Sequence, residues 1–303
     1  MGFANARLDA SGRCARPLQE VLFTSIVGGL LTEGVVPNGS LLDVGANRGI
    51  WACYLASVAP SRTVHAIDPD PRYVRIMKAN YGHVSNLRPF NAALGSASLL
   101  TDHAHAIRDG MRFFPLSEEA TRGKLQVFRL DDLFVHEKLG FAQIDVDGSE
   151  LSLLKGATAT IARDRPFFST ELHVHENPEE SRRILRFIKA MGYSSYLVEE
   201  IAGNRVDIRN LLHFPIEATP RLSGSSTLDL ASQSRKLFAV DASTITDFAF
   251  PCLDGISDRT RGRRCAVGHE DNMVRSAVLD VGPAAGPFAA SGDEAQPKRI
   301  LIQ

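Results

Sequence analysis

The chain has 303 residues, 44% of them hydrophobic, and its 34 basic and 35 acidic residues leave a net charge of −1. This length suits one large α/β domain with an appendage, or two modest domains, with a core that needs no disulfides. The balanced charge, with no dense basic run, argues against nucleic acid as a partner. Four cysteines without a paired C-x-x-C arrangement favour a reducing compartment, so a cytoplasmic location is slightly favoured.

The first apolar run, Val21–Leu31, lies between Glu20 and Glu33 and is too short to cross a bilayer as a helix. We expect a buried first helix within a helical lead-in, residues 1–39, and no membrane span. A signal peptide is the alternative, because two arginines precede the run, but no A-x-A-like cleavage site follows it.

Residues 40–217 alternate short β-rich apolar runs with helical patterns, which is typical of a doubly wound α/β sheet built from right-handed crossovers. The expected elements follow in chain order: strand Ser40–Val44, helix Gly49–Ala59, strand Thr63–Ile67, a helix capped by Asp70, strand Leu87–Leu94, strand Phe141–Val146, helix Glu150–Lys155, strand Phe167–Leu172 and a helix capped by Asn177. Tyr193–Ile201 and the run to Ile216 should be the closing antiparallel strands.

Two regions depart from this alternation. The stretch 99–130 holds shorter extended pieces, Met111–Pro115 and Leu125–Leu130, and we expect this insertion to shape an acceptor pocket. After Pro220 the composition shifts to Ser, Thr, Gly and Pro, so we expect 218–303 to be a largely irregular extension, disordered from about 278. The apolar residues of 225–250 predict a segment that packs back on the domain.

A glycine turn joins the first strand to its helix, with the sequence Asp43-Val44-Gly45-Ala46-Asn47-Arg48-Gly49. Gly45 would let the backbone approach a ligand, and Gly49 would allow close helix–strand packing. Such turns also occur without a ligand. The missing third glycine of G-x-G-x-x-G disfavours a nicotinamide or flavin, and Asp43 would repel a phosphate but attract the cationic amino-acid end of S-adenosylmethionine.

A second acid strengthens this interpretation. Asp68 ends the second strand, 19 residues beyond Gly49, where a carboxylate can hold both hydroxyls of a ribose. One acid, two glycines and another acid at this spacing favour a crevice for S-adenosylmethionine.

Six motifs then occur in order across about 40–173: Asp-Val-Gly-Ala-Asn-Arg-Gly (43–49), Ile-Asp-Pro-Asp-Pro (67–71), Asn-Ala-Ala-Leu-Gly (91–95), Leu-Asp-Asp-Leu (130–133), Ile-Asp-Val-Asp-Gly-Ser-Glu (144–150) with Leu-Lys-Gly-Ala (154–157), and Arg-Pro (165–166) with Glu171. In these motifs the chain resembles the FkbM family of methyltransferases. The resemblance implies a class I methyltransferase fold, a Rossmann-like sheet of seven strands with the last antiparallel. It also implies S-adenosylmethionine as cofactor and O-methylation of a small-molecule or glycan hydroxyl, such as a sugar or secondary metabolite.

The resemblance further implies a cofactor site. The residues that would line the methionine part are Asp43, Gly45, Asn47 and Gly49; Asp68 would hold the ribose, Asn91 and Ala92 would lie near the adenine, and Ala46, Pro69 and Asp145 complete the set. Two positions depart from the family pattern, because Asp68 replaces a more frequent Glu before proline, and Asp147 replaces the Glu of Asp-x-Glu-Gly. Each change keeps the charge and shortens the reach by one methylene.

A hydroxyl acceptor must lose its proton, so we expect a base at the carboxyl ends of the strands, where ligands bind in such sheets. His173 or Asp147 is the predicted base, and Glu171 is the third catalytic candidate. The alternatives are a turn or cap acid for Asp147, a structural carboxylate paired with Arg165 or a backbone amide for Glu171, and an exposed loop histidine for His173.

Other interpretations stay open. Asp145, Asp147, His173 and His175 could converge on a divalent metal, but no dedicated ligand motif is present and we predict none. A non-catalytic cofactor-binding module that serves a partner through 218–303 and a nicotinamide-dependent oxidoreductase are the competing functions. Two further cysteines, Cys252 and Cys265, are expected as free thiols.

Overall fold

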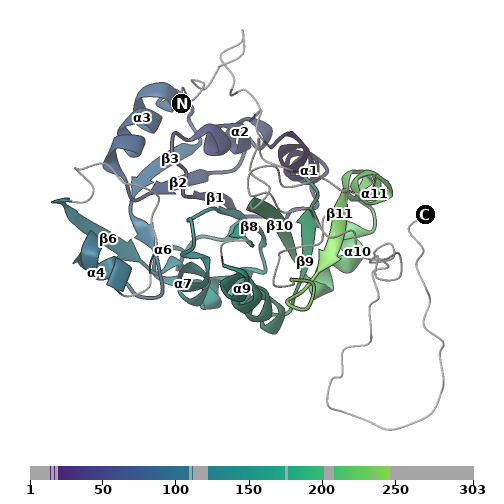
Figure 1. Ribbon diagram of the computed structural model, residues 1–303. Coiled ribbons are helices and arrows are strands. Elements are labelled where there is room, and N and C mark those ends of the chain that lie inside the picture. The colour runs from purple at the N-terminus through teal and green to yellow at the C-terminus, as the bar shows by residue number, and fades with distance from the viewer. Residues whose placement is uncertain are drawn as a thin grey trace, which may run out of the picture.

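A twisted sheet of eight strands forms the centre of the molecule, in the order β11-β9-β10-β8-β7-β1-β2-β3 (Figure 1). This computed structural model describes residues 14, 17, 20–108, 111, 122–174, 177–200, 208–234 and 236–245. The strands are β1 (Ser40–Val44), β2 (Val64–Asp68), β3 (Leu87–Asn91), β7 (Leu139–Ile144), β8 (Phe167–His173), β9 (Tyr193–Val198), β10 (Ile208–Pro215) and β11 (Leu237–Val240).

The topology confirms the predicted class I methyltransferase sheet. Strands β3, β2, β1, β7 and β8 pair in parallel, and β10 runs antiparallel to both of its neighbours, β8 and β9. An eighth strand, β11, adds to the edge by pairing antiparallel with β9. Because five neighbouring strands are parallel, their carboxyl ends meet at one edge of the sheet, where such folds bind ligands.

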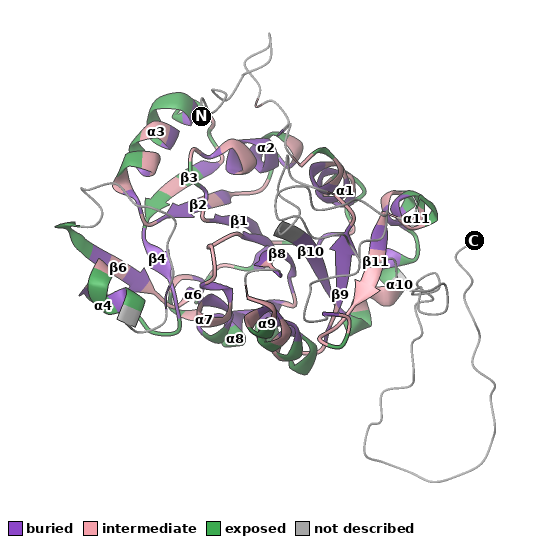
Figure 2. Cartoon of the chain, in the orientation of Figure 1, coloured by how far each residue is buried: buried purple, intermediate pink, exposed green. Residues whose placement is uncertain are grey.

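Helices cover both faces of the sheet (Figure 1). One face carries α1 (Val21–Thr32), α2 (Ile50–Val58) and α3 (Pro71–Tyr81), and the other carries α7 (Glu150–Lys155), α8 (Thr158–Asp164) and α9 (Pro178–Ala190). Successive strand residues enter separate apolar clusters: Leu41 and Phe167 pack on the first face, and Leu42 and Phe168 on the second. The sheet is therefore buried on both sides (Figure 2), as its continuous apolar strands require.

The predicted helix starts are confirmed. Asp70 caps α3, its side chain accepting a hydrogen bond from the backbone N–H of Arg72 at 2.9 Å, and Pro71 takes the first helical position. Asn177 caps α9 in the same way, accepting from the N–H of Glu180 at 3.2 Å.

The prediction of one strand over Leu87–Leu94 was wrong, because the chain leaves the main sheet at Ala92. The Asn91 side chain and the Ala92 N–H both donate to the carbonyl oxygen of Asp68, at 2.9 and 3.1 Å, at the point where the pairing with β2 ends. A second sheet follows, in the order β4-β6-β5, made of β4 (Ala93–Leu94), β6 (Lys124–Phe128) and β5 (Leu99–Asp102), with α4 (His103–Arg108) beside it. Of the extended piece predicted at Met111–Pro115, residues 112–115 lie outside the described residues.

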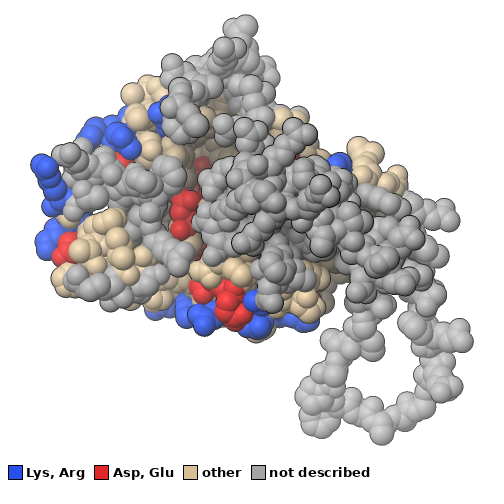
Figure 3. Space-filling model, viewed as in Figure 1, with Lys and Arg blue, Asp and Glu red and all other residues tan. Residues whose placement is uncertain are grey.

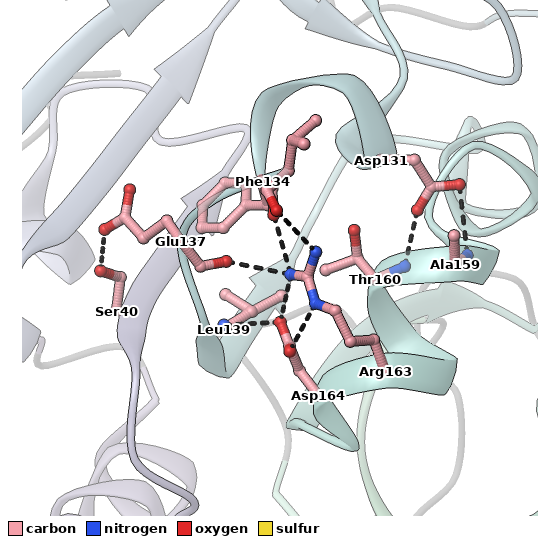
Figure 4. A network of polar contacts seen from close by, with 10 residues as sticks. Ser40, Asp131, Phe134, Glu137, Leu139, Ala159, Thr160, Arg163 and Asp164 are labelled. Atoms are coloured by element: carbon pink, nitrogen blue, oxygen red, sulfur yellow. Dashed lines mark hydrogen bonds and ion pairs between the residues drawn. The ribbon is translucent and has the colours of Figure 1, made fainter.

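Three of the sequence motifs hold this part of the fold together. A Cβ on Gly156 would lie 2.0 Å from the carbonyl oxygen of Gly95, so the two motif glycines let their segments touch. Asp131, in α6 (Leu130–Leu133), accepts hydrogen bonds from the N–H groups of Ala159 and Thr160 at the start of α8, at 3.2 and 2.7 Å (Figure 4). These motifs therefore have structural roles.

The chain beyond 218 continues the fold as far as it is described. A 3₁₀ turn (Ile216–Ala218) leads into α10 (Thr219–Leu222) and α11 (Ser226–Gln233), which contacts α1. Glu33, at the end of α1, accepts from the Ser225 and Ser226 hydroxyls, both at 2.6 Å, and from the Thr227 N–H at 2.9 Å. The segment expected to pack back does so over 226–234 and 236–245, so this part of 218–303 is more regular than predicted; the part predicted to be disordered, from about 278, lies outside the described residues.

A disulfide joins Cys14 to Cys53 of α2, across 39 residues of sequence. The cysteine spacing did not predict this pair, and its presence runs against the reasoning that favoured a reducing compartment. Cys252 and Cys265 lie outside the described residues. Within the described part of the chain, no helix is long and apolar enough to span a membrane.

Candidate functional site

The loop after β1 lies against the loop after β7. We call this region the carboxyl edge; it comprises the ends of β1, β2, β7 and β8 and the loops that follow them. Gly45 has φ +81°, and a Cβ there would lie 1.7 Å from the carbonyl oxygen of Asp145. Gly49 has φ +77°, and its Cβ would lie 2.6 Å from Cγ of Met77. Only glycine fits either position, so these residues form a close-fitting cradle.

Asp68 holds this cradle in shape. One oxygen accepts from the N–H of Asn47 at 2.7 Å, and the other accepts from the N–H of Asp70 at 2.8 Å. Burial raises the pKa of Asp68 to about 6, against the effect of these two hydrogen bonds. The carboxylate predicted to hold a ribose thus joins the glycine loop to the start of α3, and each oxygen keeps a lone pair for a ligand.

The structure brings the predicted cofactor residues to one place. Asp43 lies on β1 next to β2, which ends in Asp68, and both side chains are buried. Asn91 and Ala92 bind the Asp68 backbone from the third strand, and Pro69 follows Asp68 in the turn to α3. Ala46 is buried between these segments, its N–H donating to the carbonyl of Ile67 at 3.1 Å.

Asp43 is an unusual core residue. It is 3% exposed, and its Oδ2 has no hydrogen-bond partner among the described residues. Burial raises the pKa of Asp43 to about 7; a hydrogen bond from the backbone of Ala52 opposes this, and the negative charges of Asp68 and Glu20 add to it.

Asp145, just beyond β7, lies among other acids. Its N–H donates to the Val44 carbonyl at 3.0 Å, which fixes the β7 loop beside the glycine loop. Burial raises the pKa of Asp145 well above its usual value, and so do the negative charges of Glu171, Asp147, Glu20 and Glu150. Asp145 is therefore surrounded by acidic neighbours at the carboxyl edge.

The three catalytic candidates also lie together. Nε2 of His173 is 3.6 Å from Oδ1 of Asp147 and 3.8 Å from Oε1 of Glu171. Asp147 has φ +50° and Gly148 has φ +101°, a left-handed turn that aspartate rarely adopts. The carboxylate of Asp147 raises the pKa of His173, and the other nearby negative charges raise it further, against the effect of burial.

Arg165, one of the two structural partners considered for Glu171, does not pair with it. Arg165 pairs instead with Glu217, at 2.5 Å, and donates to the carbonyls of Met191 and Gly192 at 2.8 and 2.9 Å. These acceptors lie at the opposite end of β8 from Glu171, so Glu171 stays at the carboxyl edge with His173.

Three residues at this edge were not predicted from the sequence. Glu20 accepts from Nε1 of Trp51 at 2.7 Å and from Nδ2 of Asn210 at 2.8 Å. Glu150 is 2% exposed and accepts from the N–H of Gly148 at 3.1 Å. Glu20 and Asn210 stand outside every motif, and Glu150, the last residue of the 144–150 motif, was predicted only as the start of a helix, so local sequence carried no sign of their contacts.

Among the described residues, no group of three or more His, Cys, Asp or Glu side chains is placed to hold a metal ion. His175, which the metal hypothesis needed, lies outside the described residues.

The site fits S-adenosylmethionine in two respects. Buried Asp43 has an oxygen without a donor among the described residues, and acidic side chains gather where this cofactor is positive. Acidic atoms gather near the middle of the face shown in Figure 3. By the same logic, a dinucleotide pyrophosphate would be repelled here.

The family match agrees with this chemistry. The model of the methyltransferase FkbM domain matches residues 43–195, about half of the chain. No curated protein matches the sequence. Among solved structures, a methyltransferase FkbM from Methylobacillus flagellatus is 18% identical, with a TM-score of 0.43, over 58% of this chain and 43% of its own length. The chain therefore spans less than half of that protein.

Two further structures were found. An rRNA methylase from Streptococcus thermophilus is 12% identical, with a TM-score of 0.41, over 63% of this chain and 94% of its own. A fibrillarin from Aeropyrum pernix, solved with natively bound S-adenosyl-L-methionine, is 12% identical, with a TM-score of 0.38, over 63% of this chain and 74% of its own.

Proposed function

This chain belongs to the methyltransferase FkbM family, and we propose that it transfers the methyl group of S-adenosylmethionine to a hydroxyl of a sugar, glycan or secondary metabolite. The observation that carries the proposal is the placement of His173, between Asp147 and Glu171, at the same edge of the sheet as the glycine cradle.

The cofactor would lie along the carboxyl edge. Asp68 would accept from the ribose hydroxyls, and Asn91 and Ala92 would lie beside the adenine, one strand over. Asp43, Asp145 and the loop of Gly45, Ala46, Asn47 and Gly49 would surround the methionine part. The cofactor supplies an electrophilic methyl group, and the electron pair of the broken S–C bond stays on sulfur.

The protein's own task is to align the acceptor and take its proton. Nε2 of His173 would accept that proton as the hydroxyl oxygen bonds to the methyl carbon. The carboxylates of Asp147 and Glu171, 3.6 and 3.8 Å away, would stabilise the imidazolium that forms. In this scheme Asp147 and Glu171 orient and charge-balance the base.

The charge at the edge restricts the acceptor. Asp147 and Glu171, the carboxylates beside the proposed base, would repel a phosphorylated or polyanionic acceptor, which supports a neutral hydroxyl compound over nucleic acid. The small sheet of β4, β5 and β6, which follows β3 from this edge, is the proposed wall of the acceptor pocket.

The test compares wild type with Asp68→Ala by calorimetry with S-adenosylhomocysteine and NAD. We expect wild type to bind the first and not the second, and Asp68→Ala to weaken binding about 100-fold, since charged hydrogen bonds are worth about 3 kcal/mol. Binding of NAD alone would overturn the proposal.

A methyl-release assay with a panel of hydroxylated acceptors then separates an enzyme from a non-catalytic cofactor-binding module. Turnover by wild type that is lost in both Asp68→Ala and His173→Asn supports the enzyme. Binding of S-adenosylhomocysteine with wild type silent on every acceptor would favour the module, in which the partner-binding part would be 218–303.

A further inference from the structure

A tight turn carries Asp147 to the proposed base. β7 ends at Ile144, and the N–H of Ser149 donates to the carbonyl oxygen of Val146 at 3.2 Å, which closes a four-residue turn. Asp147 and Gly148, its two central residues, have φ +50° and φ +101°. Positive φ at both central positions is typical of a type I′ turn, which suits glycine best. Because an aspartate in this conformation is strained, the turn persists only where its surroundings hold it.

Glu150, the first residue of α7, holds this turn from the inside. It is 2% exposed, and its Oε1 accepts from the N–H of Gly148 at 3.1 Å. Burial raises the pKa of Glu150, and hydrogen bonds from the backbone of Gly148, of Glu150 itself and of Val146 act to lower it. One buried carboxylate thus gathers backbone N–H groups from both sides of Asp147.

The contact that depends on this turn is a long one. Oδ1 of Asp147 lies 3.6 Å from Nε2 of His173, beyond the usual length of a hydrogen bond. An aspartate side chain is short, so it cannot reach far to correct for a displaced backbone. Glu171 lies on the same strand as His173, and its position does not depend on the turn. A small shift of the turn would therefore separate Asp147 from His173 and leave Glu171 in place.

Building on the function proposed above, we infer that Glu150 is a positioning residue for the methyl transfer: by holding the turn 146–149, it keeps the carboxylate of Asp147 facing the imidazole of His173. Glu150 acts through Asp147 and touches neither acceptor nor cofactor in this scheme. The carboxylates of Asp147, Glu171 and Glu150 all act to raise the pKa of His173, against the effect of burial. The experiment must therefore separate the placement of Asp147 from the charge of Glu150.

The experiment titrates His173 by NMR in protein with labelled histidines and without ligand, and the spectrum of His173→Asn identifies its signal. The variants are Glu150→Ala, Glu150→Gln, Asp147→Asn and the double variant Glu150→Ala/Asp147→Asn. Asp164→Ala is the matched control, because Asp164 is also a buried acid that accepts from a backbone N–H, but it lies at the opposite end of the strands. This titration measures the pKa of His173 whether or not an acceptor is turned over.

We expect Glu150→Ala to lower the pKa of His173 by more than half of the shift that Asp147→Asn causes, because the turn no longer holds Asp147 in place. In the Asp147→Asn background, Glu150→Ala should lower it little further, since residues that act as a unit are not additive. Glu150→Gln keeps an acceptor oxygen for the Gly148 N–H without the charge, so it should retain most of the wild-type pKa. Asp164→Ala should leave the titration of His173 unchanged.

The methyl-release assay gives a second measurement. Glu150→Ala should lower kcat about 100-fold, the usual loss when a reacting group is displaced by about 1 Å. Glu150→Gln should recover most of that loss, and Asp164→Ala should show the wild-type kcat.

Two results of the titration would overturn the inference. Equal effects of Glu150→Ala in both backgrounds, matched by Glu150→Gln, would show that only the charge of Glu150 acts on His173. A titration that neither variant changes would show that Glu150 does not act on His173 at all. A thermal melt of each variant identifies any that fails to fold, and Glu150→Gln keeps the test open in that case. Wild type that turns over no hydroxylated acceptor would instead overturn the proposed function, and the titration still decides the role of Glu150.

Discussion

The two ends of the parallel strands use the same residue types in opposite ways. At the amino edge, where β1 and β7 begin, Asp164 accepts from the Leu139 N–H at 2.9 Å and from Arg163 at 2.6 Å (Figure 4). Arg163 also donates to the carbonyls of Phe134 and Glu137, at 2.8 and 3.0 Å. These hydrogen bonds hold the pKa of Asp164 below its usual value even though burial acts to raise it.

At the carboxyl edge, the pKa values of acidic residues are raised instead of lowered. Asp43 is as buried as Asp164, yet burial raises the pKa values of Asp43 and Asp145, and the neighbouring acids raise them further. A paired acid stabilises the fold, and an unpaired buried acid costs stability until a cation binds it. The acid at the amino edge therefore stabilises the sheet, whereas the acids at the carboxyl edge form the proposed cofactor site.

The largest expected effect is on the base. His173→Asn should lower kcat about 10²- to 10⁴-fold and leave S-adenosylhomocysteine affinity unchanged, since general-base catalysis contributes about that much. A base acts when neutral, and the pKa of His173 is raised, so wild-type kcat should rise with pH and level off above that pKa. Asp147→Asn should move the rise to lower pH, because it removes the main cause of the shift. If kcat depends on pH in the same way in Asp147→Asn as in wild type, the pairing of His173 with Asp147 is contradicted.

Loss of the disulfide should have the next largest effect, a loss of stability. Reducing the Cys14–Cys53 bond, or Cys14→Ala, should lower the free energy of unfolding by about 4 kcal/mol, the value that chain entropy gives for a loop of this size. Cys53 lies one turn beyond Gly49, so the loss should also weaken S-adenosylhomocysteine binding. Chemical denaturation with and without reductant measures the first effect; wild type that is equally stable under both conditions would contradict it.

Much of the fold could be predicted from local sequence. The strand Ser40–Val44 and the starts of α3 and α9 agree with the structure, because capping residues and apolar periodicity act over a few residues. The convergence of Asp145, Asp147, Glu171 and His173 could also be predicted, since parallel strands bring their carboxyl ends to one edge.

Contacts between distant segments could not be predicted in this way. Glu20 and Asn210 are 190 residues apart, Cys14 and Cys53 are 39 apart, and Arg165 binds Glu217 across 52 residues. Each pairing depends on how whole elements pack, and a polar residue has many possible partners. The split of Leu87–Leu94 was missed because local sequence does not show that Ala93–Leu94 pairs with the distant strand β6 instead of β2.

At the amino edge, Asp164→Ala should lower the free energy of unfolding by about 2 kcal/mol, because it leaves the Leu139 N–H and Arg163 without their acceptor. The stabilisation from a carboxylate with a lowered pKa is present above the pKa of the unfolded chain and is lost as pH falls through the folded value. The variant and wild type should therefore converge in acid. Affinity for S-adenosylhomocysteine should not change, and a change would mean that the two edges are coupled.

At the carboxyl edge, Asp43→Asn should raise the free energy of unfolding, the opposite of the effect of Asp164→Ala. The pKa of Asp43 is raised to about 7, so the folded protein holds this proton more tightly than the unfolded chain, and wild type loses stability as pH rises from about 4 through 7. Asparagine keeps the acceptor for Ala52 and carries no charge, so the variant should be more stable than wild type by about 1 kcal/mol at pH 8 and by less at pH 5. It should also bind S-adenosylhomocysteine more weakly. Chemical denaturation at pH 5 and pH 8, without ligand, measures the stability difference between the variant and wild type. A variant less stable than wild type at pH 8 would show that the Asp43 carboxylate has a stabilising partner.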